Sequence, residues 1–180
     1  MTYPTELNTP RLRLRQWQPS DLEPFATMNS DTDVMRYYPA PWSREQSAAF
    51  AKRVMRLIDE RGWGFWAVEE RASGRFIGFV GLHIPSNDLP FSPCVEVGWR
   101  LAKSYWGLGY ATEAAQSAIS FGFQQLRPAE LVAFTAIINL KSRAVMERLG
   151  MQFSAEFDHS QVPVESGLRR HVLYRLRSPV

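Results

Sequence analysis

The sequence contains a single cysteine, Cys94, and this scarcity excludes two kinds of stabilising crosslink. One cysteine cannot form an internal disulfide, and it cannot build a cysteine-based zinc site. The three histidines, at positions 83, 159 and 171, do not have the spacing of metal ligands either. We therefore predict a domain that binds no metal and is held together by its core, with Cys94 as a small buried residue in a reducing compartment.

Long hydrophobic runs are also missing. The longest apolar stretch, LVAFTAII at 131–138, is far shorter than the roughly 18 residues that a membrane-spanning helix needs. The first residues, MTYPTELNTPRLRLRQ, contain no apolar segment of the kind found in signal peptides. We expect a soluble, cytoplasmic protein without a membrane partner.

Charge of one sign is not concentrated anywhere. The chain has 21 basic and 18 acidic residues, with a net charge of +3, and the two signs are interspersed. A protein that binds nucleic acid would carry a basic stripe. Near the N-terminus Arg11, Arg13 and Arg15 alternate with Leu12 and Leu14, a pattern typical of a strand with one solvated face. We therefore predict no nucleic-acid partner.

The 180 residues, 45% of them hydrophobic, suit one globular domain spanning 1–180. Hydrophobic periodicity and turn signals predict alternating strands and helices. The expected strands are 10–17, 65–70, 75–84, 94–102, 130–137, 151–157 and 169–176, and the expected helices are 20–30, 43–62, 110–125 and 139–150. This order predicts an α/β domain with a mixed sheet, antiparallel in its early part and linked by crossover helices later.

Several local signals set the boundaries of these elements. Ser20 or Asp21 is the expected N-cap of the first helix, and SREQ at 43–46 is a capping box for the second. Gly74 predicts a hairpin between the second and third strands. Asn139 is placed to cap the last helix.

The stretch SYWGLGYATEA, residues 104–114, joins a strand to a helix through Gly107, Gly109 and Ala111. Free backbone N–H groups and the positive end of a helix dipole make such a turn an anion site, although the same residues suit a plain tight turn. It is not a Walker A loop, because no Gly-Lys-Ser/Thr follows. A dinucleotide fingerprint would need a small residue where Thr112 stands, and an acidic residue at the end of the next strand, which Glu130 instead precedes.

Two segments, WRLAKSYWGLGYATEA at 99–114 and NLKSRAVMERLGM at 139–151, together resemble the acetyl-CoA-binding core of the GNAT N-acetyltransferase superfamily. The family pattern is Gln/Arg-x-x-Gly-x-Gly/Ala, and Trp106 stands at its first position. That departure is typical of the RimJ/RimL-like branch, which acetylates ribosomal-protein N-termini. The segments TPRLRLRQWQPSDLEPF, GFWAVEERASGRFIGFVGL and HVLYRL are similar to that branch as well. The resemblance implies a single GNAT domain, with a mostly antiparallel sheet of about six or seven strands splayed at its centre and about four helices.

The resemblance also implies where acetyl-CoA would bind. Its pyrophosphate would lie against the backbone N–H groups of Gly107 to Ala111, where glycines allow a close approach. Its pantetheine arm would follow the strand before the turn, and a bulge near Gly98 or Trp99 would open the slot for it. The implied cofactor-binding residues are Trp99, Leu101, Trp106, Gly107, Leu108, Gly109, Tyr110, Ala111, Asn139 and Ser142.

The implied reaction is direct attack of a neutral amine on the thioester in a ternary complex. Glu96 stands where many family members have a base acting through water, and Glu156 and Asp158 are rival candidates. Many members protonate the leaving thiolate with a tyrosine at the position of Met146, which cannot donate a proton. Ser142 is then the predicted replacement, as the RimJ/RimL-like branch suggests.

The acceptor is the least defined part of this interpretation. It could be a protein N-terminal amine, such as that of a ribosomal protein, or a small-molecule amine. The loops expected to line its side are rich in aromatic residues, namely Tyr37, Tyr38, Trp42, Trp63, Trp66 and His83, which could equally be ordinary core. The alternative function is a non-catalytic acyl-CoA-binding or sensing module with the same fold. The family is compatible with either a monomer or a homodimer.

Overall fold

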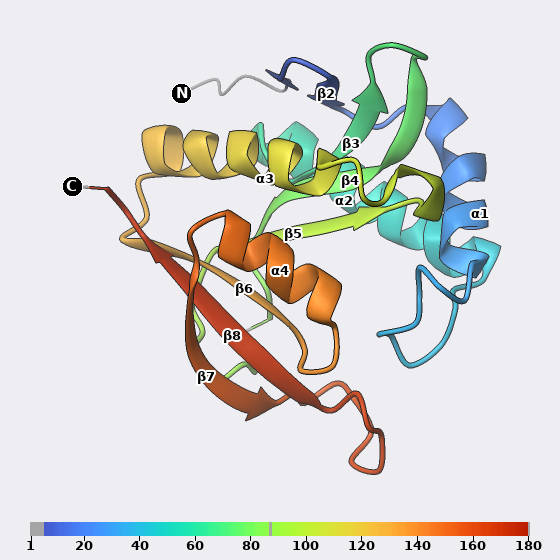
Figure 1. Cartoon of the computed structure of the whole chain (residues 1–180). Helices are drawn as coiled ribbons and strands as arrows, with labels where there is room; N and C mark the ends of the chain where they lie inside the picture. Colours follow the sequence, from blue (N-terminus) through green and yellow to red (C-terminus); the bar gives the residue numbers. More distant parts are fainter. Residues whose placement is uncertain (1–5, 87, 180) are drawn as a thin grey trace.

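The computed structural model describes residues 6–86 and 88–179, which form one eight-stranded sheet with four α-helices (Figure 1). The strands are β1 (Leu7–Asn8), β2 (Leu12–Arg15), β3 (Phe65–Glu70), β4 (Arg75–His83), β5 (Glu96–Leu101), β6 (Glu130–Ala136), β7 (Gln152–Asp158) and β8 (Arg170–Arg177). The helices are α1 (Leu22–Ser30), α2 (Arg44–Arg61), α3 (Tyr110–Phe121) and α4 (Leu140–Arg148). Three short turns, η1 (Pro19–Asp21), η2 (Lys103–Tyr105) and the π-helical η3 (Gly122–Leu126), complete the elements.

The strand order is β1-β2-β3-β4-β5-β6-β8-β7, and every neighbouring pair is antiparallel except β5 and β6. Helices α1 and α2 pack on each other and against β3 and β4, whereas α3 lies along β2, β4 and β5 (Figure 1). The predicted fold class is thus confirmed. The two-residue β1 makes the sheet one strand larger than the sequence indicated. The prediction of an unexported chain was based on the first 16 residues. Of these, residues 1–5 lie outside the described residues.

Strands β5 and β6 pair at one position and then diverge. Their only registered pair is Glu96 with Val132, supported by a 2.9 Å bond from the Val132 N–H to the Val95 carbonyl. The predicted bulge near Gly98 or Trp99 is wrong, because β5 pairs with β4 without interruption. The sheet opens because the pairing with β6 stops, and the free edge of β5 then faces a gap between the two strands.

The local capping signals were mostly correct. The Ser43 hydroxyl accepts from the Gln46 N–H, and the Gln46 side chain accepts from the Ser43 N–H, so SREQ is a complete capping box for α2. Asn139 likewise caps α4 by accepting from the Ser142 N–H. Asp21 stands at the N-cap of α1 but makes no capping bond there.

Asp21 is used instead as the partner of a buried charge. Its carboxylate and that of Glu69 each accept from Arg15, at 2.7 Å. The interpretation of the N-terminal arginines as one solvated face is therefore wrong for Arg15, of which only 5% is exposed. A buried cation needs such partners, because desolvation without them costs several kcal/mol.

The hydrophobic core includes residues from β2, β3, β4 and β5 and from all four helices. Cys94 is partly buried beside a second, smaller cluster, and this burial raises the pKa of its thiol to about 11. Within the described ranges, we find no helix long and apolar enough to cross a membrane.

Candidate functional site

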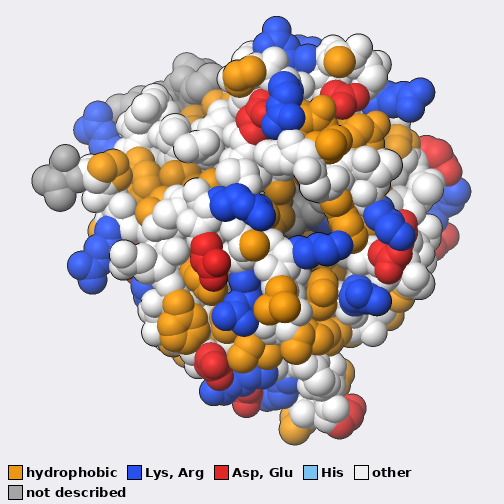
Figure 2. Space-filling view, in the orientation of Figure 1, with side chains coloured by type: hydrophobic (Ala, Val, Ile, Leu, Met, Phe, Trp, Pro, Cys, Tyr) orange, Lys and Arg blue, Asp and Glu red, His pale blue; other side chains and the backbone are white. Residues whose placement is uncertain are grey.

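A cleft of about 1820 Å³ lies where β5 and β6 separate. Its walls come from the loop after α1, from β5, from the turn before α3, from the start of α4 and from the segment around His159. Figure 2 shows the surface hollowed in this region, with hydrophobic and basic side chains around the opening. The described residues include no group of three or more His, Cys, Asp or Glu placed to hold a metal ion.

The glycine turn forms one end of this cleft. Gly107 and Gly109 have φ angles of 75° and 79°, a left-handed conformation that other residues adopt only with strain. A β-carbon at Gly107 would meet nothing within 4 Å, and one at Gly109 would meet only Arg11, at 3.4 Å. The N–H groups of Gly107, Leu108 and Gly109 have no acceptor among the described residues. Open space beside free donors at a helix N-terminus fits a phosphate group.

Arg11, in the turn between β1 and β2, holds the glycine turn in place. Its Nη1 donates to the Leu108 carbonyl at 2.9 Å, and its Nε donates to Glu113 at 2.6 Å. Thr9 donates to the same carboxylate, and the guanidinium lies 4.5 Å from the centre of the Tyr110 ring. Because these contacts join the β1–β2 turn to α3, the glycine turn is held from outside the cleft.

Most of the predicted cofactor-binding residues line the cleft together. They are Trp99, Leu101, Trp106, Gly107, Gly109, Tyr110, Ala111, Asn139 and Ser142. Leu108 does not, since its side chain is about half exposed on the surface and its carbonyl is bonded to Arg11. The Trp106 indole donates to the Leu101 carbonyl at 2.8 Å, which covers that end of β5. Whether these residues bind a cofactor stays a prediction.

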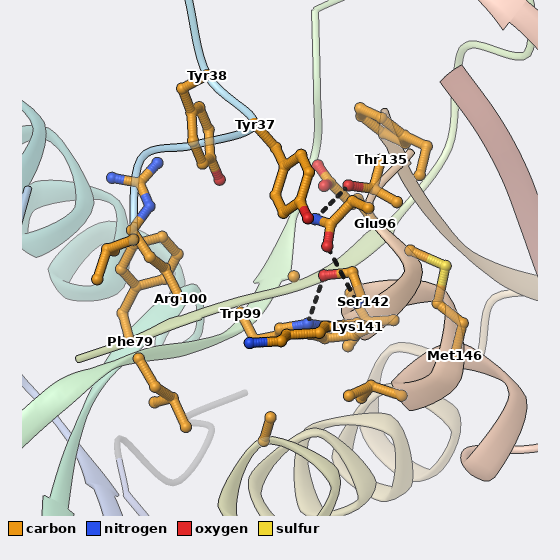
Figure 3. A pocket seen from close by; sticks show the side chains of 18 of the residues that line it. Tyr37, Tyr38, Phe79, Glu96, Trp99, Arg100, Thr135, Lys141, Ser142 and Met146 are labelled. Atoms are coloured by element: carbon orange, nitrogen blue, oxygen red, sulfur yellow. Dashed lines mark hydrogen bonds between the residues drawn. The ribbon is translucent and has the colours of Figure 1, made fainter. Parts of the chain in front are cut away.

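Ser142 belongs to a short hydrogen-bonded chain (Figure 3). The Trp99 indole N–H donates to the Ser142 hydroxyl oxygen at 3.2 Å. Asn139 accepts from the Ser142 backbone N–H and donates through Nδ2 to Thr135, at 2.9 Å. The Ser142 hydroxyl hydrogen has no acceptor among the described residues, so this hydroxyl can donate into the cleft. Met146 also lines the cleft and is itself almost fully buried.

Glu96 lies where β5 and β6 diverge. It forms the one registered pair between these two strands, with Val132. Burial raises the pKa of its carboxyl to about 8, and no hydrogen bond or ion pair to it occurs in the described part of the chain. Its cross-strand neighbour His83 is packed on Phe65, with ring centres 5.1 Å apart. Burial and the nearby Arg53 and Arg61 charges lower the pKa of His83 to about 4, so His83 is neutral at pH 7. A carboxyl titrating near neutrality in a cleft is a candidate acid or base.

The two rival bases lie elsewhere. Glu156 and Asp158 are exposed on β7, and each is ion-paired with Arg170 across the hairpin, at 3.0 and 3.3 Å. Neither side chain lines the cleft. The hypothesis that one of them serves as the base is therefore wrong, because the strand that carries them forms the outer edge of the sheet.

The aromatic residues divide into two groups. Tyr37, Tyr38, Trp42 and His83 line the cleft, as the sequence suggested. Trp63 and Trp66 do not, because both are buried in the hydrophobic core, where Trp66 packs edge-on against Phe121 of α3. For these two, the ordinary core interpretation is correct.

Arg100 lines the cleft although the sequence interpretation gave it no role. Arg100 lies on the same face of β5 as Glu96, with only 7% of it exposed, and its guanidinium is 4.3 and 4.4 Å from the ring centres of Tyr38 and Trp42. Its position on a strand was predicted, because it lies within the expected strand 94–102. Its partners come from segments distant in sequence, which no local pattern indicates.

Comparison with known proteins agrees with this geometry. A family model described as "Acetyltransferase (GNAT) domain" matches residues 11–152. The uncharacterized protein YkkB of Bacillus subtilis is 31% identical over 157 residues, which cover 86% of this chain and 89% of the relative. An Aspergillus fumigatus FsC-acetyl coenzyme A-N(2)-transacetylase is 28% identical over 180 residues, which cover 94% of this chain and 76% of the relative.

Solved structures share the fold. A GNAT-family acetyltransferase from Bacillus anthracis superimposes with a TM-score of 0.80 at 24% identity, covering 96% of this chain and 98% of the other. RimL, a ribosomal α-N-protein acetyltransferase in complex with coenzyme A, gives a TM-score of 0.73 at 15% identity, covering 94% and 95% of the two chains.

Proposed function

Because the chain belongs to the GNAT acetyltransferase family, we propose that it transfers the acetyl group of acetyl-CoA to a primary amine, by direct attack in a ternary complex. The proposal treats residues 1–180 as one catalytic domain. It rests on one observation above all, which is that the glycine turn, the free edge of β5, Glu96 and Ser142 share a single cleft. RimL, a neighbour in fold, was solved with coenzyme A, which supports the choice of cofactor.

The cofactor would be held by backbone at two places. The N–H groups from Gly107 to Ala111 suit its pyrophosphate, and the edge of β5 from Trp99 to Leu101, freed from β6, suits its pantetheine arm. Acetyl-CoA supplies an activated thioester carbonyl to the site when it is bound. The chain itself would orient that carbonyl and exclude water. It would also accept the proton that the amine loses and donate a hydrogen bond to the leaving thiolate.

Glu96 would take the proton that the attacking amine gives up, directly or through a water molecule. Its pKa of about 8 makes it a stronger base than an ordinary carboxylate. An α-amino group titrates near ~8 and an alkylamine near ~10.4, so the pKa of Glu96 is well matched to an α-amino acceptor. An exposed carboxylate with an unshifted pKa would be a weak acceptor for that proton.

Ser142 would donate a hydrogen bond to the leaving thiolate. Its oxygen already accepts from Trp99, and a hydroxyl that accepts one hydrogen bond donates a stronger one. Trp99 and Asn139 act as positioning residues, because they fix the hydroxyl and the helix that carries it.

We predict that Ser142→Ala lowers kcat at least about tenfold, because the thiolate then leaves without a hydrogen bond. Acetyl-CoA affinity should change less than about twofold, since the contact matters mainly in the transition state. Steady-state kinetics and calorimetry measure the two effects. Ser120→Ala, on the exposed side of α3, is the matched control and should leave both values unchanged. Unchanged turnover in Ser142→Ala would remove Ser142 from the mechanism.

Two classes of acceptor amine have support from relatives and structural neighbours. RimL acts on a ribosomal α-amine and the Aspergillus relative is an N(2)-transacetylase, so both a protein N-terminus and a small-molecule amine are supported as acceptors. The alternative, a non-catalytic acyl-CoA sensor, is favoured by Met146 at the position where many family members have a tyrosine acid.

Thiol release from acetyl-CoA tests the proposed function. The acceptors are ribosomal-protein N-terminal peptides, amino acids and polyamines, assayed with the whole chain. Release that depends on one of these amines is the expected result. Tight acetyl-CoA binding without release on any acceptor would contradict catalysis and support the sensor.

A further inference from the structure

Two arginines of this protein are buried to nearly the same extent but have very different surroundings. Arg15 is 5% exposed and is paired with Asp21 and Glu69. Arg100 is 7% exposed and makes no ion pair within the described residues. One cation is thus neutralised by the protein, whereas the other is not.

The neighbours of Arg100 satisfy only part of its hydrogen-bonding capacity. Its Nη1 donates to the Asn29 side-chain oxygen at 2.9 Å, and Asn29 in turn donates to Ser47, at 3.0 Å. The Nε atom is fully buried and has no partner among the described residues, and Nη2, which has none either, is the donor that a bound anion can reach. The rings of Tyr38 and Trp42 attract the charge but offer the guanidinium N–H groups no acceptor in their planes. A buried cation with free donors is costly unless an anion completes the site.

Among the described residues that line the cleft, no carboxylate is both free and close enough to do so. Asp33 and Glu113 line the cleft, but they are paired with Lys103 and Arg11. Glu96 is four residues away on the same strand, so the two Cα atoms are about 13 Å apart. Arg53 also lines the cleft and has no ion pair among the described residues. The local charge therefore favours a negatively charged group on whatever binds there.

Resting on the proposed function, we propose that the acceptor amine carries a carboxylate and that Arg100 binds this carboxylate between Tyr38 and Trp42. In Figure 3, Arg100 lies on the Tyr38 side of the cleft and Glu96 on the opposite side, with Tyr37 between them. The amine must reach Glu96 while the carboxylate reaches Arg100. The acceptor is accordingly an extended molecule, such as a short peptide or an ω-amino acid, in which more than one carbon separates the two groups.

Pairs of acceptors that differ only in the carboxylate test this assignment. ε-Aminohexanoate is compared with its carboxamide, and alanylalanine with its C-terminal amide, by thiol release from acetyl-CoA. The acid should have a kcat/KM at least about tenfold above that of the amide in one pair or both. Equal values for acid and amide would overturn the assignment while leaving the acetyltransferase function standing. This comparison uses the unaltered protein and so does not depend on any variant folding.

Variants then locate the effect. Arg100→Gln should bring the acid-to-amide ratio close to one, and Arg100→Lys should retain part of it. Arg53→Gln is the matched control, because it removes a positive charge from the lining of the same cleft and leaves the contacts of Arg100 with Tyr38 and Trp42 in place. A ratio that collapses in Arg53→Gln and survives in Arg100→Gln would overturn the role of Arg100.

A binding measurement separates failure of the inference from failure of the proposed function. If none of the acceptors causes thiol release from acetyl-CoA, the proposed function fails. Calorimetry with ε-acetamidohexanoate and its carboxamide, in the presence of coenzyme A, still decides the role of Arg100. Tighter binding of the acid that is lost in Arg100→Gln supports the carboxylate site, and equal binding of the two contradicts it.

Discussion

Replacing Glu96 with glutamine is expected to lower kcat by about 100-fold or more, within the range lost when a general base is removed. The wild-type rate should rise with pH up to about 8, because Glu96 must lose its proton before it can accept one. In Glu96→Gln that rise should follow the pKa of the acceptor amine alone. A pH series of kcat at saturating acetyl-CoA measures both effects. Glu156→Gln, which alters an exposed carboxylate on β7, is the control and should behave like wild type.

The same substitution should stabilise the folded protein at high pH. The folded state holds the Glu96 proton up to about pH 8, whereas the unfolded chain releases it near 4.5. The Glu96 contribution to the free energy of unfolding is therefore fully present below pH 4.5 and falls until the pH passes about 8. Above that pH, Glu96→Gln should be more stable by an amount on the order of a few kcal/mol. Denaturant unfolding at pH 5 and pH 9 tests this, and loss of stability at both pH values would show that Glu96 is not desolvated.

Replacing Gly109 with tryptophan should weaken acetyl-CoA binding by at least about 100-fold. A β-carbon at Gly109 would lie 3.4 Å from Arg11, so a tryptophan there would displace the side chain that holds the turn and its free N–H groups in position. The left-handed backbone adds a strain of about 1–2 kcal/mol for any residue with a β-carbon. Calorimetry gives the affinity, and circular dichroism shows whether the domain remains folded.

Gly74 provides the matched control for that strain. It has a φ of 68° in the turn between β3 and β4, and a β-carbon there would meet nothing within 4 Å. Gly74→Trp should therefore carry a similar conformational penalty and keep its affinity for acetyl-CoA. If Gly109→Trp binds acetyl-CoA as well as Gly74→Trp does, the sequence at 104–114 forms a turn and nothing more.

The features that the sequence predicted correctly are those whose cause is local. SREQ determines a capping box within four residues, and Gly107 and Gly109 are required by their own backbone angles. Strand periodicity also located β5, which lies within the expected strand 94–102. In each case the physical reason lies within one element or at its end, and a single chain displays it.

The errors concern contacts between distant segments. The sequence could not show that β5 stops pairing with β6 after one residue pair. A bulge near Gly98 or Trp99 was expected to open the sheet instead, and β5 has none. It could not distinguish Trp66, which packs on α3, from Trp42, which lines the cleft. Arg100 and Asn29 are 71 residues apart, and no periodicity connects them.

The contact between Arg11 and the glycine turn couples ligand binding in the cleft to the attachment of the β1–β2 turn. Arg11 bonds to the turn through the Leu108 carbonyl and to α3 through Glu113. A ligand that orders the glycine turn would therefore strengthen the attachment of the β1–β2 turn to α3, and firm attachment of the β1–β2 turn would strengthen ligand binding by the same factor. Strands β1 and β2, at one edge of the sheet, are thus linked to occupancy of the cleft although neither contributes a side chain to its chemistry.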